Sequence, residues 1–136
     1  MKKELQEKLF TKYPKIFVQK DLPKDQTCMC WGICCDDGWY WLIDMLCGCI
    51  QSYFDNNKKH LKISQVEAEQ VKQKMGGLRF YINECDDRIS GFIWLAEYMS
   101  YYICENCGST ENIQPQETRG WINTICDKCW KKKNGG

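Results

Sequence analysis

Two Cys-x-x-Cys pairs near the C-terminus constrain this chain more than any other feature. Cys104 and Cys107 form the first pair, Cys126 and Cys129 form the second, and 18 residues separate the pairs. Zinc takes four thiolates at the corners of a tetrahedron, and a Cys-x-x-Cys turn presents two of them on one side of a tight loop. The spacing therefore predicts one structural Zn²⁺ held by all four cysteines, with no coordination position left open for catalysis.

A redox dithiol is the alternative interpretation of such a pair. It would need a single pair in a βαβ setting, and the sequence lacks that setting. Gly108 suits the left-handed residue that closes a zinc-binding turn. Residues 120–125 are typical of a strand leading into the second pair, and we expect Trp121 on it to pack over the metal.

Seven of the 11 cysteines lie outside these pairs. We expect most of them to be small buried side chains, with Cys47 facing the core. A second metal site is the alternative, with ligands drawn from Cys28, Cys30, Cys34 and Cys35. The odd number of cysteines and the absence of a secretory signal disfavour a secreted disulfide scaffold and favour a soluble, cytoplasmic protein.

Hydropathy and charge argue against two classes of partner, namely membranes and nucleic acids. The most apolar stretch, 39–50, is too short to cross a bilayer and contains Asp44, so no membrane partner is expected. The 19 basic residues nearly cancel the 18 acidic ones, giving a net charge of +1. One zinc ion with four thiolates would lower that charge to about −1. Binding of nucleic acid by the zinc ribbon, to modulate transcription, is therefore the alternative function and not the favoured one.

Hydrophobic periodicity predicts an α+β fold with several helices and a short antiparallel sheet. We expect helices over 2–12, from Trp39 onward, and after Asp86, with acidic residues capping the last two. The alternation over 78–82 predicts a strand. The chain should divide into an α+β domain (1–103), a zinc ribbon (104–130) and a disordered tail (131–136).

The segment 65–75 is also predicted to be a helix, because Ser64 and Glu67 have the spacing of a capping box. Gly76 and Gly77 would end this helix in a left-handed turn.

Two groups of residues are candidate ligand contacts. Aromatic rings with neighbouring carboxylates could stack a nucleobase and hold its amines; they are Trp31, Asp36, Asp37, Trp39 and Trp41. The backbone of two adjacent glycines, with cationic side chains on either side, could bind a phosphate; this group is Lys74, Gly76, Gly77 and Arg79. Core packing and a helix C-cap, respectively, are the favoured alternatives for these groups.

Catalysis is not expected. A cysteine nucleophile needs a base, and the single histidine, His60, lies in a polar turn. The adjacent acids Asp36-Asp37 and Asp86-Asp87 are better explained as helix caps.

Several motifs occur in a fixed order between Tyr13 and Cys129: KYPKIF, CMCWG, DGWYWLID, EQVKQKMGGLRFY and CENCG followed by GWINTIC. This order resembles a family of small uncharacterised proteins encoded by bacteriophages and prophages. Met75 and Asp36 depart from the family pattern, which has Phe and Gly there. The family has no catalytic residue to carry over.

The resemblance implies a phage accessory protein with a terminal zinc ribbon, acting in the host cytoplasm. Such a protein would be a non-enzymatic binder that inhibits antiviral defence, either by binding a host protein or by sequestering a small nucleotide signal. A virion-associated structural part is a third possibility, and the oligomeric state is left open.

Overall fold

Two small sheets organise the chain, whose computed structural model describes residues 1–135. In the first sheet, β1 (Ile33–Cys34) runs parallel to β2 (Ala68–Lys74), which pairs antiparallel with β3 (Gly77–Ile82). In the second sheet, β4 (Ile113–Thr118) pairs antiparallel with β5 (Trp121–Cys126). The fold is therefore α+β, as predicted.

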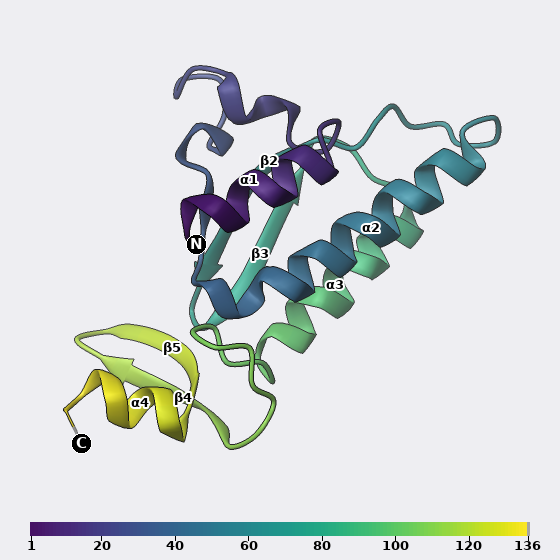
Figure 1. Ribbon diagram of the computed structural model, residues 1–136. Helices are drawn as coiled ribbons and strands as arrows, with labels where there is room; N and C mark the ends of the chain where they lie inside the picture. The colour runs from purple at the N-terminus through teal and green to yellow at the C-terminus, as the bar shows by residue number, and fades with distance from the viewer. Residues whose placement is uncertain (136) are drawn as a thin grey trace.

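Four α-helices accompany the sheets: α1 (Lys3–Lys12), α2 (Tyr40–Asn57), α3 (Asp87–Ser100) and α4 (Asp127–Lys133). The helices α2 and α3 lie side by side, and the β4–β5 ribbon with α4 sits at one end of the molecule (Figure 1). The helices predicted over 2–12, from Trp39 and after Asp86 are confirmed, and Asp86 caps α3 by accepting a hydrogen bond from Ile89 N–H. The acidic cap predicted for the helix from Trp39 is wrong, because Trp39 precedes α2 and no side chain caps this helix. Helix α4 continues to Lys133, so part of the expected tail is helical; Gly136 lies outside the described residues.

The core forms where α1 and α2 meet the buried face of the first sheet. Leu9 of α1, Ile43 of α2, and Val71 and Leu78 of the sheet are all fully buried. Trp39, just before α2, is also fully buried, and its indole N–H donates to the Ile103 carbonyl at 2.9 Å. Burial of these apolar side chains supplies the main driving force for the fold.

The prediction of a helix over 65–75 is wrong, because this segment contains β2. Val71 and Gln73 face the core while Lys72 and Lys74 do not, which is the two-residue alternation of a strand. The polar Gln73 at a buried position conceals that pattern in the sequence. Met75 and Gly76 then form a two-residue hairpin turn, with φ of +54° and +81°, as a type I′ turn requires. The two glycines therefore belong to a hairpin and not to a helix end.

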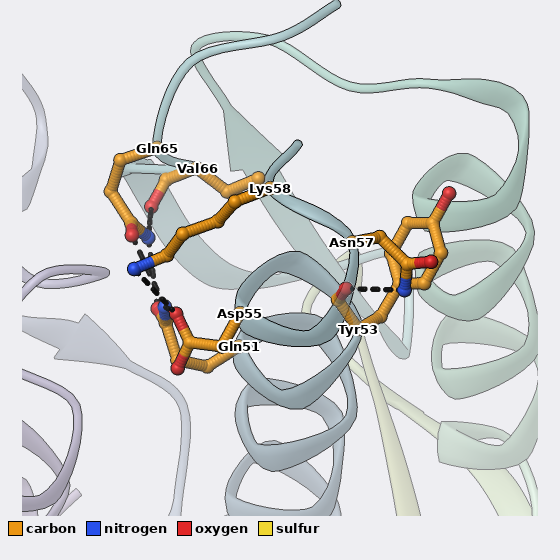
Figure 2. A network of polar contacts seen from close by, with 7 residues as sticks. All are labelled: Gln51, Tyr53, Asp55, Asn57, Lys58, Gln65 and Val66. Atoms are coloured by element: carbon orange, nitrogen blue, oxygen red, sulfur yellow. Dashed lines mark hydrogen bonds and ion pairs between the residues drawn. The ribbon is translucent and has the colours of Figure 1, made fainter. Parts of the chain in front are cut away.

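Side-chain partners explain why Ser64–Glu67 does not begin a helix. Figure 2 shows Gln65 reaching the last turns of α2, where it exchanges hydrogen bonds of 2.8 and 3.1 Å with the Gln51 side chain. The Ser64 hydroxyl donates to Glu84, and Val66 is fully buried. These tertiary contacts fix the segment in an extended path leading into β2.

Helix α3 covers the outer edge of β3. The Ser100 hydroxyl oxygen accepts a hydrogen bond from Leu78 N–H at 2.9 Å, which satisfies a donor that would otherwise be exposed at an edge strand. In the second sheet, β4 contains Pro115, which has no N–H to donate.

The ribbon is attached to the rest of the molecule by backbone contacts with Gly38. Gly38 N–H donates to the Glu105 carbonyl at 2.7 Å. A Cβ atom at Gly38 would clash with the Cys104 carbonyl oxygen and lie 2.5 Å from the Glu105 oxygen. A second attachment joins Thr124 of β5 to the hairpin turn, where its hydroxyl donates to the Gly76 carbonyl at 2.6 Å.

A buried carboxylate links α1 to α2. Asp44 accepts hydrogen bonds from the Tyr13 hydroxyl at 2.5 Å and the Lys12 ammonium at 3.0 Å. Burial alone would raise the pKa of Asp44, but these two hydrogen bonds outweigh it and hold the pKa below the usual aspartate range.

We expect Gly38→Ala to lower the free energy of unfolding by about 3 kcal/mol, because backbone atoms must move to admit the methyl group. Gly91→Ala is the matched control, since a Cβ there meets nothing within 4 Å; this change should stabilise α3 by about 0.5–1 kcal/mol. Urea unfolding measures both. Equal effects of the two substitutions would contradict the packing described for Gly38.

We expect Asp44→Asn to destabilise the protein by about 1–2 kcal/mol at pH 7. A depressed carboxyl pKa stabilises the fold above the usual aspartate pKa, and this contribution is lost as the pH falls through the depressed value. The difference between wild type and variant should therefore shrink on acidification. Paired urea unfolding curves measure it, since any loss of zinc at low pH affects both proteins alike. A difference that stays constant down to acidic pH would contradict the argument.

Candidate metal centre and adjoining cleft

The structure brings the four predicted ligands together. The sulfur atoms of Cys104, Cys107, Cys126 and Cys129 all lie within 4.8 Å of one another. Gly108 has φ of +80° and donates its N–H to the Cys104 carbonyl at 2.8 Å, closing the first turn as predicted. This geometry forms a single structural zinc site, with all four tetrahedral positions supplied by protein thiolates.

Hydrogen bonds to sulfur prepare the site for a cation. Cys129 N–H donates to Cys126 Sγ at the start of α4, and this bond lowers the pKa of Cys126 to about 7. The Asn106 amide donates to Cys129 Sγ at 3.2 Å. Burial and, to a smaller extent, hydrogen bonds with neighbouring sulfurs together raise the pKa of Cys107 to about 12. A bound dication would stabilise the thiolates, so binding should release protons.

The tryptophan beside the metal centre is Trp130, not Trp121. Trp130 packs against the small core that contains Cys104, Ile125 and Cys126. Trp121 is 59% exposed, so the expectation that it covers the metal is wrong. The strand carrying Trp121 buries its last three residues against the centre, which leaves its first residue outside the ribbon core.

Residues 1–135 form no second cluster of potential metal ligands. Within residues 1–135, the four C-terminal cysteines are the one group of potential ligands close enough to hold an ion. Cys35 is buried, and burial raises the pKa of its thiol. Cys28 and Cys34 are exposed, and the Cys30 thiol donates to the Thr27 carbonyl at 3.4 Å. Cys47 is buried in the core, as predicted.

A cleft of about 660 Å³ lies between the first sheet and the ribbon. Its walls combine aromatic, acidic and basic side chains, including Asp36, Glu105, Trp121, Asn123, Trp130 and Lys133. The volume falls in the range of small-molecule sites, which are concave and have a few polar groups that orient the ligand. The cleft adjoins the metal centre because Glu105 follows the first zinc ligand in the chain.

Glu105 is the most unusual polar residue in the cleft wall. It is only 6% exposed; one carboxylate oxygen accepts from Asp36 N–H at 3.2 Å, and the other, Oε2, is buried without a hydrogen-bond partner. Burial raises the pKa of Glu105, and the nearby Asp36 charge adds to that effect. Leaving a buried carboxylate oxygen without a partner is costly, and the nearby Lys133 charge offsets part of that cost.

The five predicted base-binding residues divide between core and surface. Trp39 is fully buried and serves the core, as the favoured alternative anticipated. Asp36 reaches the cleft, whereas Asp37 accepts a hydrogen bond from Lys2 N–H. Trp31 and Trp41 are exposed, but neither lines this cleft. The structure therefore does not gather this group into one site.

The four predicted phosphate contacts lie on or beside the β2–β3 hairpin. The Gly76 carbonyl is used by Thr124, and Gly77 packs against the Tyr101 hydroxyl. The Arg79 guanidinium donates to Leu78 O and to the Tyr101 hydroxyl at 3.1 Å, and the latter bond raises its pKa. Lys74 is exposed beside the turn. The two glycines thus serve packing, and the cations lie on the open face of the sheet.

Sequence reasoning missed the residues that surround the cleft. Glu105 lies between the cysteines of a zinc turn, where a polar residue is ordinarily exposed, and no local pattern marks it as buried. Trp130 is the last residue of the predicted zinc ribbon, and Lys133 lies in the segment predicted to be a disordered tail. The assembly of these residues depends on how the ribbon docks, which is a tertiary feature.

Comparisons with protein-family models, with curated proteins and with solved structures found no match to this chain. The resemblance to phage proteins therefore receives no support from them. Within residues 1–135, no helix has both the length and the apolar character needed to cross a membrane.

Purified protein should contain about one zinc ion per chain. Cys126→Ser should lose this zinc to a chelator and melt at a lower temperature, because metal binding contributes to the folding of the ribbon. Cys85→Ser is the matched control, since Cys85 is exposed and outside the cluster. Elemental analysis and thermal denaturation measure both. A second equivalent of tightly bound zinc, or a Cys126→Ser protein that keeps its zinc, would contradict the assignment.

Proposed function

We propose that this chain is a non-enzymatic binding protein that holds a small nucleotide in the cleft between its first sheet and its zinc ribbon. The observation that carries the proposal is the combination of an exposed tryptophan, two carboxylates and a lysine around one cavity. The all-cysteine metal centre supports binding over turnover, because it offers structure and no open coordination position.

The base would stack on Trp121. This ring is more than half exposed at the cleft, so its face is available, and stacking on an aromatic side chain tolerates any base. Asp36 is exposed at the same cleft and would accept hydrogen bonds from amine or imide N–H groups of the base. Glu105 contributes negative charge deeper in the wall, which favours ligand donors over acceptors.

The phosphate would pair with Lys133. This lysine lies in the last turn of α4 and in the cleft wall, next to Lys131 and Lys132 in sequence. Its positive charge is close enough to Glu105 to lower the pKa of that carboxyl against the effect of burial. A ligand with a donor-rich base and an anionic phosphate would match both signs of charge.

Sequestration of such a nucleotide would suit an inhibitor of antiviral signalling in a host cytoplasm, the role that the phage resemblance suggests. The binding chemistry does not depend on that biological setting, since it rests on the cleft residues alone. The proposal can therefore be tested on the purified protein.

A specific observation favours a second candidate, binding of single-stranded nucleic acid on the open face of the first sheet. Lys72 and Arg79 are cross-strand partners there, and the Lys72 ammonium lies 5.8 Å from the centre of the exposed Tyr81 ring. Cations interleaved with an aromatic ring on an open sheet are typical of nucleic-acid surfaces. This candidate places the contacts on the sheet instead of on the ribbon.

Isothermal calorimetry with zinc-loaded protein tests the first candidate, using AMP, GMP, CMP, UMP, ADP-ribose and cyclic dinucleotides as probes. At least one should bind, and Trp121→Ala should weaken it about 5- to 150-fold, the value of one stacked base. Trp31→Ala is the matched control, because Trp31 is 67% exposed and outside the cleft. Chromatography after incubation should recover the ligand unchanged.

Absence of heat with every probe up to about 1 mM would contradict the proposal, and so would equal losses from Trp31→Ala and Trp121→Ala. Binding of an oligonucleotide that weakens steeply with salt and is lost in Lys72→Ala would favour the sheet surface instead.

A further inference from the structure

An apolar face runs along α2 and α3, and none of its residues lines the cleft. Its six exposed side chains are Trp41, Met45, Trp94, Leu95, Tyr98 and Tyr102. Trp94 and Tyr98 of α3 and Tyr102 in the turn after it follow at four-residue spacing, and their successive ring centres are 5.8 and 5.4 Å apart. The rings therefore form one continuous ridge on the helix surface.

A groove accompanies this ridge. It lies between α2 and α3, has a volume of about 140 Å³, and is lined only by apolar side chains and Cys49. Met45 and Leu95 form opposite walls. The two helices thus present a ridge and a groove beside one another, as helices in a bundle do.

Asp87 and Arg88 lie at the N-terminal end of this face, whereas Glu97, the other charged residue of α3, is turned toward β3. Glu97 accepts a hydrogen bond from the Phe80 backbone and lies near Arg79 of β3. Arg88 lies over the Tyr53 ring at 5.4 Å. In a two-fold symmetric contact each residue meets a copy of the same surface, so like charges would face one another. Because charges are confined to its N-terminal end, most of this face avoids that repulsion and is suited to self-association.

The exposed area is close to what a dimer needs. A large aromatic side chain buries about 150–250 Å², and each of the four aromatic residues on this face is more than half exposed. With Met45 and Leu95, the six side chains offer roughly 600 Å² per chain, against about 800 Å² per partner in a stable interface. Contiguous apolar patches of this size on a protein surface mark interaction sites.

We infer that α2 and α3 form the interface of a homodimer, in which two helix pairs pack as a four-helix bundle. The aromatic ridge of each chain would pack against the groove of the other, with Leu95 near the centre. This arrangement uses none of the cleft residues, so the dimer and the proposed ligand site can be tested separately.

Sedimentation equilibrium of the zinc-loaded full chain tests the inference. The measured mass should rise with concentration from 16.1 kDa toward twice that value. Leu95→Glu and Trp94→Glu should each weaken dimerisation at least about 10-fold, because a charge is then buried against an apolar surface. Trp31→Glu is the matched control, since it alters an equally exposed tryptophan outside this face.

Both helix variants change exposed side chains, so circular dichroism and zinc content should match wild type. A protein that stays monomeric up to about 200 μM would overturn the inference. A dimer that survives both helix substitutions, or one lost only with Trp31→Glu, would also overturn it.

Discussion

The close backbone contact between Gly38 and the first cysteine turn is the constraint on which the rest of the structure depends. Gly38 N–H donates to the Glu105 carbonyl, and the space around Gly38 admits no Cβ atom. The next residue, Trp39, anchors the core and binds the Ile103 carbonyl. Successive residues therefore fix both the start of α2 and the position of the metal centre.

This contact makes the metal centre part of a larger architecture. A metal ion that joined only the two cysteine turns would stabilise the ribbon by itself. Here the first turn also holds Glu105, whose carboxylate accepts a hydrogen bond from Asp36 N–H. Metal binding consequently positions Glu105 in the cleft wall, and the core positions Asp36, which contacts it.

Local patterns in the sequence predicted much of the fold. The four zinc ligands, the left-handed Gly108, the Asp86 cap and the main helices all depend on short-range spacing, and the structure contains each of them. The segment 65–75 was predicted incorrectly because its capping-box spacing competed with tertiary contacts of Gln65 and Val66. Propensity is a weak guide where a segment is held by distant partners.

The cleft could not be predicted from the sequence for a related reason. Asp36 was among the candidate ligand residues, but Glu105 and Trp130 gain their roles only when the ribbon docks against the first sheet. Trp39 and Trp41 are two residues apart, yet one is fully buried and the other is 58% exposed. Composition alone does not distinguish such neighbours, because the burial of each ring depends on the direction in which its side chain points at the start of α2.

Pro115 limits how the ribbon can grow. It lies in β4, and within residues 1–135 each strand of the second sheet has the other as its one neighbour. A proline there removes one of the N–H groups that an incoming chain would need for strand addition. The folded ribbon therefore resists strand addition by another chain at the β4 edge.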